Sequence, residues 1–94
     1  MIGDVMISIG YRNYVSPDRI VSIVLPSSRP VKAMISGARE EGMLVDATMG
    51  KKTKSVLVLD SRHVVLSANS VETLVGRVRD YFARLAYGDE EVVG

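Results

Sequence analysis

The chain has 94 residues, a formal net charge of +1, 47% hydrophobic residues and no cysteine. This length corresponds to one domain, and the lack of cysteine excludes disulfides, zinc–thiolate sites and a thiol nucleophile. No apolar run approaches the ~20 residues that cross a bilayer, and the N-terminus lacks the basic and apolar regions of a signal peptide. We therefore expect a cytoplasmic protein with no membrane contact.

The first half of the chain contains two predicted strands and one predicted helix. Apolar, β-branched residues at Val5–Ile9 and Arg19–Leu25 are typical of strands, and turn residues separate the two runs. The period then changes to that of a helix. It is expected to begin near Pro30 and to end at Gly42, because proline favours the first helical turn and glycine the residue after the last.

The second half predicts three strands and a C-terminal helix. Met43–Thr48 and Ser55–Leu59 are strand-like runs, and we interpret residues 50–54 between them as the tip of a hairpin. His63–Ser67 is a further strand, and Val71–Leu85 carries an apolar stripe at helical spacing. The order β-β-α-β-β-β-α predicts an α+β fold with two helices and a small, mostly antiparallel sheet.

Three of the predicted strands are apolar on both alternating faces, at Ile20–Leu25, Val56–Leu59 and Val64–Leu66. This pattern suits strands that are covered on both sides, by helices or by another subunit. So short a chain has little interior of its own, and part of its apolar surface is expected to lie in a subunit interface. We therefore expect a homo-oligomer.

The segment 50–54 carries three lysines, Lys51, Lys52 and Lys54, and no acidic residue. A compact positive loop suits a polyanion, and the commonest polyanion is a nucleic acid. The alternative is that the lysines only prevent edge-to-edge aggregation of a sheet. A phosphate-binding P-loop is excluded, because the glycine spacing is wrong and a strand-like run follows where the motif requires a helix.

The residues that catalysis would need do not assemble into a recognisable pattern. His63 is the single histidine of the chain and begins an apolar strand, where a packed or surface role is more common than that of a base. Asp46 and Asp60 flank the lysine segment and could form a metal or acid–base pair, but we interpret them as balancing nearby Lys and Arg charges. We expect neither enzymatic activity nor a metal or other cofactor.

Three blocks of the sequence resemble a known bacterial family. They are NYVS, DRIVSIV and PSSRP within residues 13–30, REEGMLVDAT and GKKTK within 39–54, and LDSRHVVLSA at 59–68. In this order and spacing they are similar to the RemA-like extracellular-matrix regulatory proteins. The resemblance implies one RemA-like domain, which we place over residues 1–87. Residues 88–94 are short and acidic, and we expect this tail to fray.

The resemblance also implies a function. RemA-like proteins form rings of seven or eight subunits and bind double-stranded DNA upstream of biofilm-matrix operons, through a strand-block arginine and two adjacent basic residues. The matching residues here are Arg19, Lys51 and Lys52, and we add Lys54 and Arg12 to the expected DNA-binding set. The family pair is commonly Arg-Arg, and its replacement by lysine keeps phosphate attraction but removes the planar fork that reads guanine.

Two other functions use the same basic segment. The first is an RNA-binding module, although RNA recognition usually adds exposed aromatic residues and these are only 5% of the chain. The second is a structural ring in which the lysines hold a phosphate-bearing metabolite. A competition experiment with duplex DNA, single-stranded RNA and nucleotides distinguishes DNA binding from these two alternatives.

Overall fold

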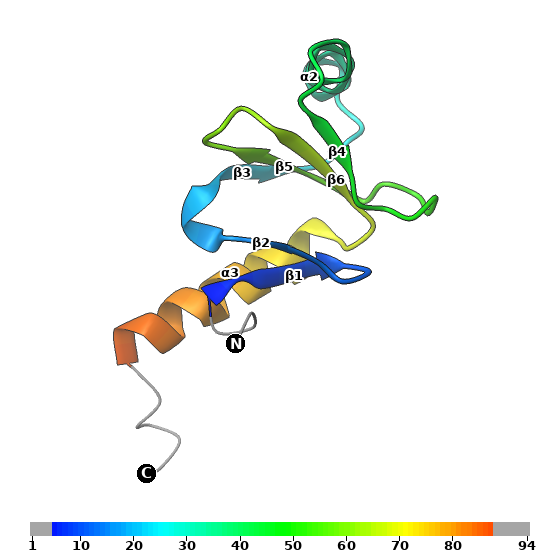
Figure 1. Ribbon diagram of the computed structural model, residues 1–94. Helices are drawn as coiled ribbons and strands as arrows, with labels where there is room; N and C mark the ends of the chain where they lie inside the picture. Colours follow the sequence, from blue (N-terminus) through cyan, green and yellow to red (C-terminus); the bar gives the residue numbers. More distant parts are fainter. Residues whose placement is uncertain (1–4, 88–94) are drawn as a thin grey trace.

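The computed structural model describes residues 5–87 and shows an α+β fold, with its elements in the order β-β-β-α-β-β-β-α (Figure 1). The predicted fold class is therefore confirmed. Residues 88–94, for which we predicted an acidic tail, lie outside the described residues. The elements are β1 (Ile7–Gly10), β2 (Asn13–Val15), a short 3-10 helix (Pro17–Arg19), β3 (Ile20–Val24), α2 (Arg29–Glu40), β4 (Leu44–Asp46), β5 (Ser55–Leu59), β6 (Val64–Ser67) and α3 (Val71–Tyr87).

The strands form two sheets. β1 and β2 pair antiparallel as a two-stranded sheet, and the other four strands form a sheet in the order β3-β5-β6-β4. β5 pairs antiparallel with β3 and with β6, whereas β4 pairs with β6 in parallel, with Leu44 opposite Val64 and Asp46 opposite Leu66. The sheet is thus mostly antiparallel, with one parallel pair at its edge.

The predicted hairpin between Met43–Thr48 and Ser55–Leu59 is wrong. β5 already has β3 on one side and β6 on the other, so no edge of β5 remains for β4. The segment between β4 and β5 instead crosses the end of β6, and it forms no strand. In the structure β4 ends at Asp46 and β5 begins at Ser55, so the connection is longer than the two to five residues that usually join a hairpin.

The short strand β2 was not predicted. Gly10, Tyr11 and Arg12 all have positive φ, at +105°, +53° and +66°, so the chain reverses within this turn and pairs β2 with β1. The Asn13 side chain supports the reversal by donating a hydrogen bond of 3.0 Å to the carbonyl of Gly10. A three-residue strand is too short to show an alternating pattern. The sequence therefore indicated only turns in this region.

Both faces of the central strands β5 and β6 are covered within the chain. Leu57 and Val65 pack with Leu74 of α3 and with the β1–β2 sheet, while Val56 and Val64 pack against α2 on the opposite face. This alternation explains why the central strands carry apolar residues on both faces. The prediction of cover on both sides is confirmed for β5 and β6, whereas in β3 Val21 is 67% exposed.

The bounds of α2 follow from its caps. The Ser28 hydroxyl accepts a hydrogen bond of 3.3 Å from the amide of Val31, and Pro30 lies in the first turn as predicted. Gly42 has φ +73° and follows the last turn, a conformation that glycine adopts without steric cost. Between residues 5 and 87, neither helix combines the length and the apolar character that a bilayer crossing requires.

Candidate nucleic-acid interface

Residues 47–54, which we call the lysine loop, begin with a tight turn. The Asp46 carboxylate accepts two hydrogen bonds from Thr48, of 2.9 Å from its amide and 2.6 Å from its hydroxyl. The Thr48 carbonyl then accepts a hydrogen bond of 2.9 Å from the amide of Lys51. Met49 and Gly50 stand between them with φ +53° and +78°, which is the signature of a type I′ turn.

The two ends of the lysine loop are fixed to the end of β6. The amide of Ala47 donates to the carbonyl of Leu66 at 2.9 Å, and the amide of Lys54 donates to the carbonyl of Ser67 at 2.8 Å. All three lysine side chains of the loop are exposed. The loop therefore presents three ammonium groups to solvent from a backbone that is hydrogen-bonded at its start, at its turn and at its end.

A buried polar cluster ties the β1–β2 turn to the base of the lysine loop. Ser55 and Ser67 are fully buried, and their hydroxyls donate to the carbonyls of Asn69 and Ile9, each at 2.8 Å. The Ser67 hydroxyl also accepts a hydrogen bond of 3.0 Å from the amide of Asn69. Ser67 is hydrogen-bonded both to Ile9 of β1 and to Lys54 of the lysine loop. The β1–β2 turn and the lysine loop therefore project from the same end of the molecule (Figure 1).

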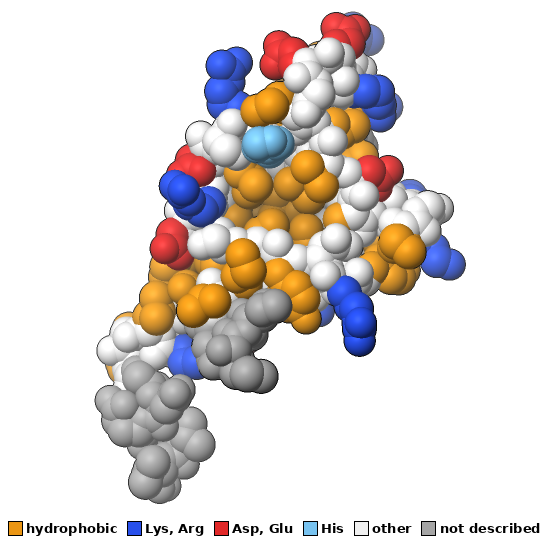
Figure 2. Space-filling model, in the orientation of Figure 1, with side chains coloured by type: hydrophobic (Ala, Val, Ile, Leu, Met, Phe, Trp, Pro, Cys, Tyr) orange, Lys and Arg blue, Asp and Glu red, His pale blue; other side chains and the backbone are white. Residues whose placement is uncertain are grey.

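This end of the molecule gathers most of the predicted cations. Arg12 is exposed at the β1–β2 turn, and Lys51, Lys52 and Lys54 are exposed on the lysine loop. We call these four residues the basic end. Figure 2 shows Lys and Arg side chains around hydrophobic ones where these turns project. Four exposed cations on two hydrogen-bonded turns create a local positive potential that the net charge of +1 does not reveal.

Arg19 does not belong to the basic end. Its guanidinium donates a hydrogen bond of 2.9 Å to the carboxylate of Asp60, and the two side chains are 67% and 44% exposed. Ser55 begins β5 beside the lysine loop and Asp60 follows its other end, so about 17 Å of strand separates Arg19 from the loop. Within one subunit the structure therefore does not bring Arg19 to the lysines.

The two aspartates singled out from the sequence have separate roles. Asp60 balances Arg19, which confirms the predicted charge balance, and Asp46 orients the lysine loop through Thr48. They lie at different ends of the sheet and form no pair. His63 is half-buried, and its Nδ1 lies 2.7 Å from the Ser61 hydroxyl. Among residues 5–87 no group of three or more His, Asp or Glu side chains is placed to hold a metal ion.

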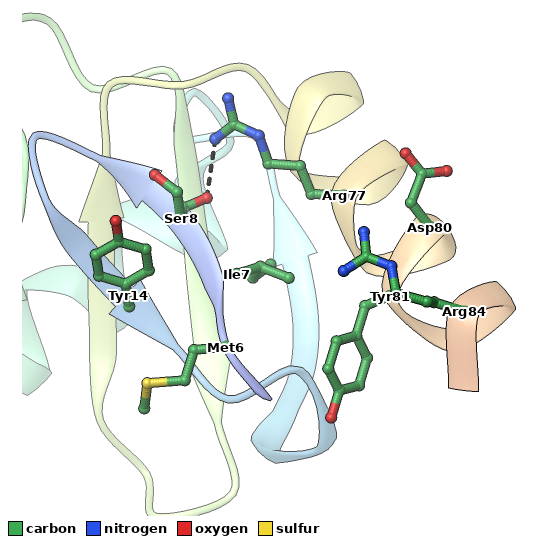
Figure 3. Close-up of a pocket in the computed structure, with 8 residues that line it drawn as sticks. All are labelled: Met6, Ile7, Ser8, Tyr14, Arg77, Asp80, Tyr81 and Arg84. Atoms are coloured by element: carbon green, nitrogen blue, oxygen red, sulfur yellow. Dashed lines mark hydrogen bonds between the residues drawn. The ribbon is translucent and has the colours of Figure 1, made fainter. Parts of the chain in front are cut away.

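A separate pocket of about 240 Å³ lies between α3 and the β1–β2 sheet (Figure 3). Arg77 extends across it and donates hydrogen bonds to the carbonyl of Ser8 at 2.8 Å and to the side chain of Asn69 at 2.9 Å. The guanidinium is thus bonded to acceptors of the protein itself. It joins α3 to the buried polar cluster, and through that cluster it supports the basic end.

Sequence reasoning missed the parts that hold the basic end together. Ser55 and Ser67 carried no signal, because serine near a strand end is an ordinary turn residue. The place of Met49 in the turn was not predicted either, because methionine typically fills a core or an interface and rarely adopts positive φ, whereas here it is exposed. A type I′ turn was detectable only through Gly50, which occupies one of its two central positions.

The pKa of Asp46 lies below its ordinary value, because Thr48 donates hydrogen bonds to the carboxylate from its hydroxyl and its amide. The folded state therefore binds this proton less tightly than the unfolded chain. The carboxylate stabilises the fold above the unfolded pKa of about 3.9, and this contribution is lost as the pH falls through the lowered folded pKa.

We expect the free energy of unfolding to fall less steeply below about pH 5 in Asp46→Asn than in the unmodified protein. The amide keeps an acceptor for Thr48 but does not titrate. Urea denaturation at a series of pH values measures the difference, with Asp18→Asn as the control at an exposed aspartate outside the lysine loop. Parallel curves for all three proteins would mean that ionisation of the Asp46 carboxylate does not contribute to stability.

This part of the chain is similar to a known family of proteins. The sequence model of the RemA-like family, described as extracellular matrix regulatory protein A-like, matches residues 6–78. The matched region runs from the start of β1 into α3 and includes both turns of the basic end.

Several relatives that carry names are about half identical to the chain. A regulatory protein of Symbiobacterium thermophilum is 50% identical over 86 residues, covering 92% of this chain and 90% of the relative. One of Carboxydothermus hydrogenoformans is 53% identical over 72 residues, covering 77% and 83%. Extracellular matrix regulatory protein A of Bacillus subtilis is 49% identical over 73 residues, covering 78% and 82%. The chain therefore belongs to the RemA-like family of bacterial regulatory proteins.

Proposed function

We propose that this protein is a homo-oligomeric DNA-binding transcriptional regulator of the bacterial cytoplasm, which acts by binding and not by catalysis. One observation carries the proposal: two hydrogen-bonded turns present Arg12, Lys51, Lys52 and Lys54 from the same end of the molecule. The name of the Bacillus subtilis relative supports genes of the extracellular matrix as its targets.

The shape and chemistry of the basic end favour duplex DNA over the alternatives. The lysine loop projects from the body of the protein (Figure 1), whereas a phosphate metabolite is usually held in a concave site. RNA modules stack bases on several exposed aromatic rings, and the basic end offers the single ring of Tyr11. Lysines are point charges that suit backbone phosphates, which a duplex presents at regular spacing.

One subunit would bind DNA weakly at cellular salt, because four cations release few counterions. Repetition of the basic end in a closed assembly changes this. Once one subunit is bound, the next meets the same duplex at high effective concentration, and the overall affinity rises without any new type of contact. The proposal therefore includes a ring of seven or eight subunits, as the family resemblance implies.

Two different apolar surfaces are available for such an assembly. A gap of about 340 Å³ between α2 and the sheet is lined by Met34, Gly37 and Val58, and Figure 2 shows hydrophobic side chains exposed in the middle of the molecule. A groove of about 410 Å³ runs between β3 and α3, where Val21 is 67% exposed beside Phe82. Rings require a head-to-tail contact between two unlike surfaces, and these two fit that requirement.

A salt titration tests the DNA proposal. We expect log Kobs to fall by roughly 0.9 per log unit of salt for each phosphate contact, hence by between about 3 and 4 for each engaged subunit that uses all four cations. Fluorescence anisotropy with a labelled promoter duplex and a scrambled duplex measures the slope, and single-stranded RNA and free nucleotides serve as competitors.

The control arms decide between the three functions. Equal competition by single-stranded RNA would favour an RNA module, and displacement by micromolar nucleotide would favour a metabolite site. A shallow slope with a large preference for the promoter at high salt would mean direct base readout, and it would contradict binding led by phosphate contacts.

A further inference from the structure

Among residues 5–87, Met49 is the most exposed large hydrophobic residue, at 72%. It stands at the turn of the lysine loop with φ +53°. An unbranched apolar side chain rarely adopts this left-handed conformation, and such strain persists where surrounding contacts enforce it. Apolar exposure and backbone strain therefore coincide at one position, in the middle of the basic end.

The surrounding contacts prevent Met49 from relaxing into the protein. Thr48 is buried and bonded to the Asp46 carboxylate on one side, and Lys51 donates to the Thr48 carbonyl on the other. The ends of the loop are bonded to β6, so the turn cannot fold back to bury the thioether. The loop holds an apolar side chain away from its own core and among cations.

We propose that Met49 is a wedge that enters between two adjacent base pairs of duplex DNA and kinks the duplex there. The inference rests on the proposed function and deepens it. The lysine ammonium groups would bind phosphates on either side of the opened step, and the unbranched thioether would replace part of the lost stacking. Minor-groove proteins use methionine and other apolar side chains in this way, with kinks of about 20–90°.

Two further features fit a wedge. Methionine is long and flexible, so it adapts to the irregular gap between unstacked bases. Tyr11, which is 50% exposed with φ +53°, stands at the β1–β2 turn of the same end and offers a second apolar surface to the duplex. A pyrimidine–purine step such as TA opens most easily, so the wedge would select such steps without hydrogen bonds to their edges.

Two variants of Met49 distinguish the effect of the apolar side chain on DNA from the effect of the lysine charges. Met49→Gly removes the side chain at a φ that glycine adopts freely, so the turn and the lysines remain. Met49→Leu keeps an apolar side chain of similar size. Arg62→Gly is the matched control, because Arg62 also has a positive φ, of +77°, but lies at the β5–β6 turn beside Asp60.

The readouts are the fluorescence of 2-aminopurine at a central TA step and energy transfer between dyes at the ends of a short duplex. We expect both signals to rise with the unmodified protein, Met49→Leu and Arg62→Gly. With Met49→Gly we expect neither signal, an unchanged salt slope, and an affinity lower by roughly tenfold to a hundredfold, which corresponds to one methionine side chain left unburied.

Each other outcome overturns the wedge in a distinguishable way. If the unmodified protein binds duplex without either signal, the wedge is wrong and the DNA-binding function stands. If it binds no duplex, the function fails and the wedge fails with it. If Met49→Gly changes the oligomer mass in light scattering, Met49 belongs to a subunit contact and not to the DNA surface.

Discussion

Replacing Lys51 and Lys52 together by alanine is expected to weaken duplex binding by roughly 30-fold for each engaged subunit at 0.15 M salt, since two phosphate contacts per subunit are lost. In a ring that engages several subunits these losses multiply, and binding should become undetectable in a gel shift. Both side chains are exposed, and the bonds that hold the lysine loop involve its backbone. We therefore expect unchanged circular dichroism and an unchanged oligomer mass.

A second double variant provides the matched control. Lys32→Ala with Arg39→Ala also removes two exposed cations, from α2 instead of the basic end, and should bind DNA almost normally. If this control loses affinity while the Lys51/Lys52 variant retains it, the DNA surface lies on α2. Arg19→Ala completes the series, and its effect should be smaller because Asp60 already neutralises part of the charge.

The second large effect concerns assembly. Gly37 lies inside α2, where glycine destabilises a helix by about 1 kcal/mol relative to alanine. A Cβ at this position would meet no atom within 4 Å, so packing within the subunit does not require glycine. We expect Gly37→Glu to block the α2 gap and Val21→Glu to block the β3 groove, and each variant alone should be monomeric.

Mixing the two variants distinguishes a head-to-tail contact from a symmetric one. Each variant retains the surface that the other lacks, so the mixture should form a heterodimer of about twice the 10.2 kDa chain mass and nothing larger. Analytical ultracentrifugation measures this, with Ser36→Glu on α2 as the control that should assemble fully. A mixture that stays monomeric would mean that the two surfaces do not meet each other.

Much of the fold could be predicted because its signals are local. Pro30 and Gly42 mark the limits of α2 through backbone preferences that act within a few residues. The apolar runs of β5 and β6 indicate strands covered on both faces, and both are covered. What the pattern could not specify was the neighbour of each strand. An apolar run fits an antiparallel hairpin and a parallel edge equally well, and therefore β4 was assigned to β5 and not to β6.

The sequence predicted the charged residues of the candidate site but not their arrangement in space. Lys51, Lys52 and Lys54 stand out in the sequence, but their association with Arg12 depends on the hydrogen bond from Ser67 to Ile9, which spans 58 positions. No local pattern encodes a bond of that range. The same limit applies to Arg19, whose distance from the lysines follows from the direction of β5 and not from any feature of the residue.

The parallel pairing of β4 with β6 also constrains the order of folding. The β5–β6 hairpin is local and is expected to form early, whereas the parallel pairing of β4 with β6 joins segments that lie farther apart in the sequence and is expected to form later. The lysine loop then becomes ordered in the same late step, because one of its ends continues β4 and both are bonded to β6. A nascent chain would consequently gain its compact core before it gained affinity for nucleic acid. Fraying of this three-residue edge strand would withdraw that affinity while the remainder of the domain stayed folded.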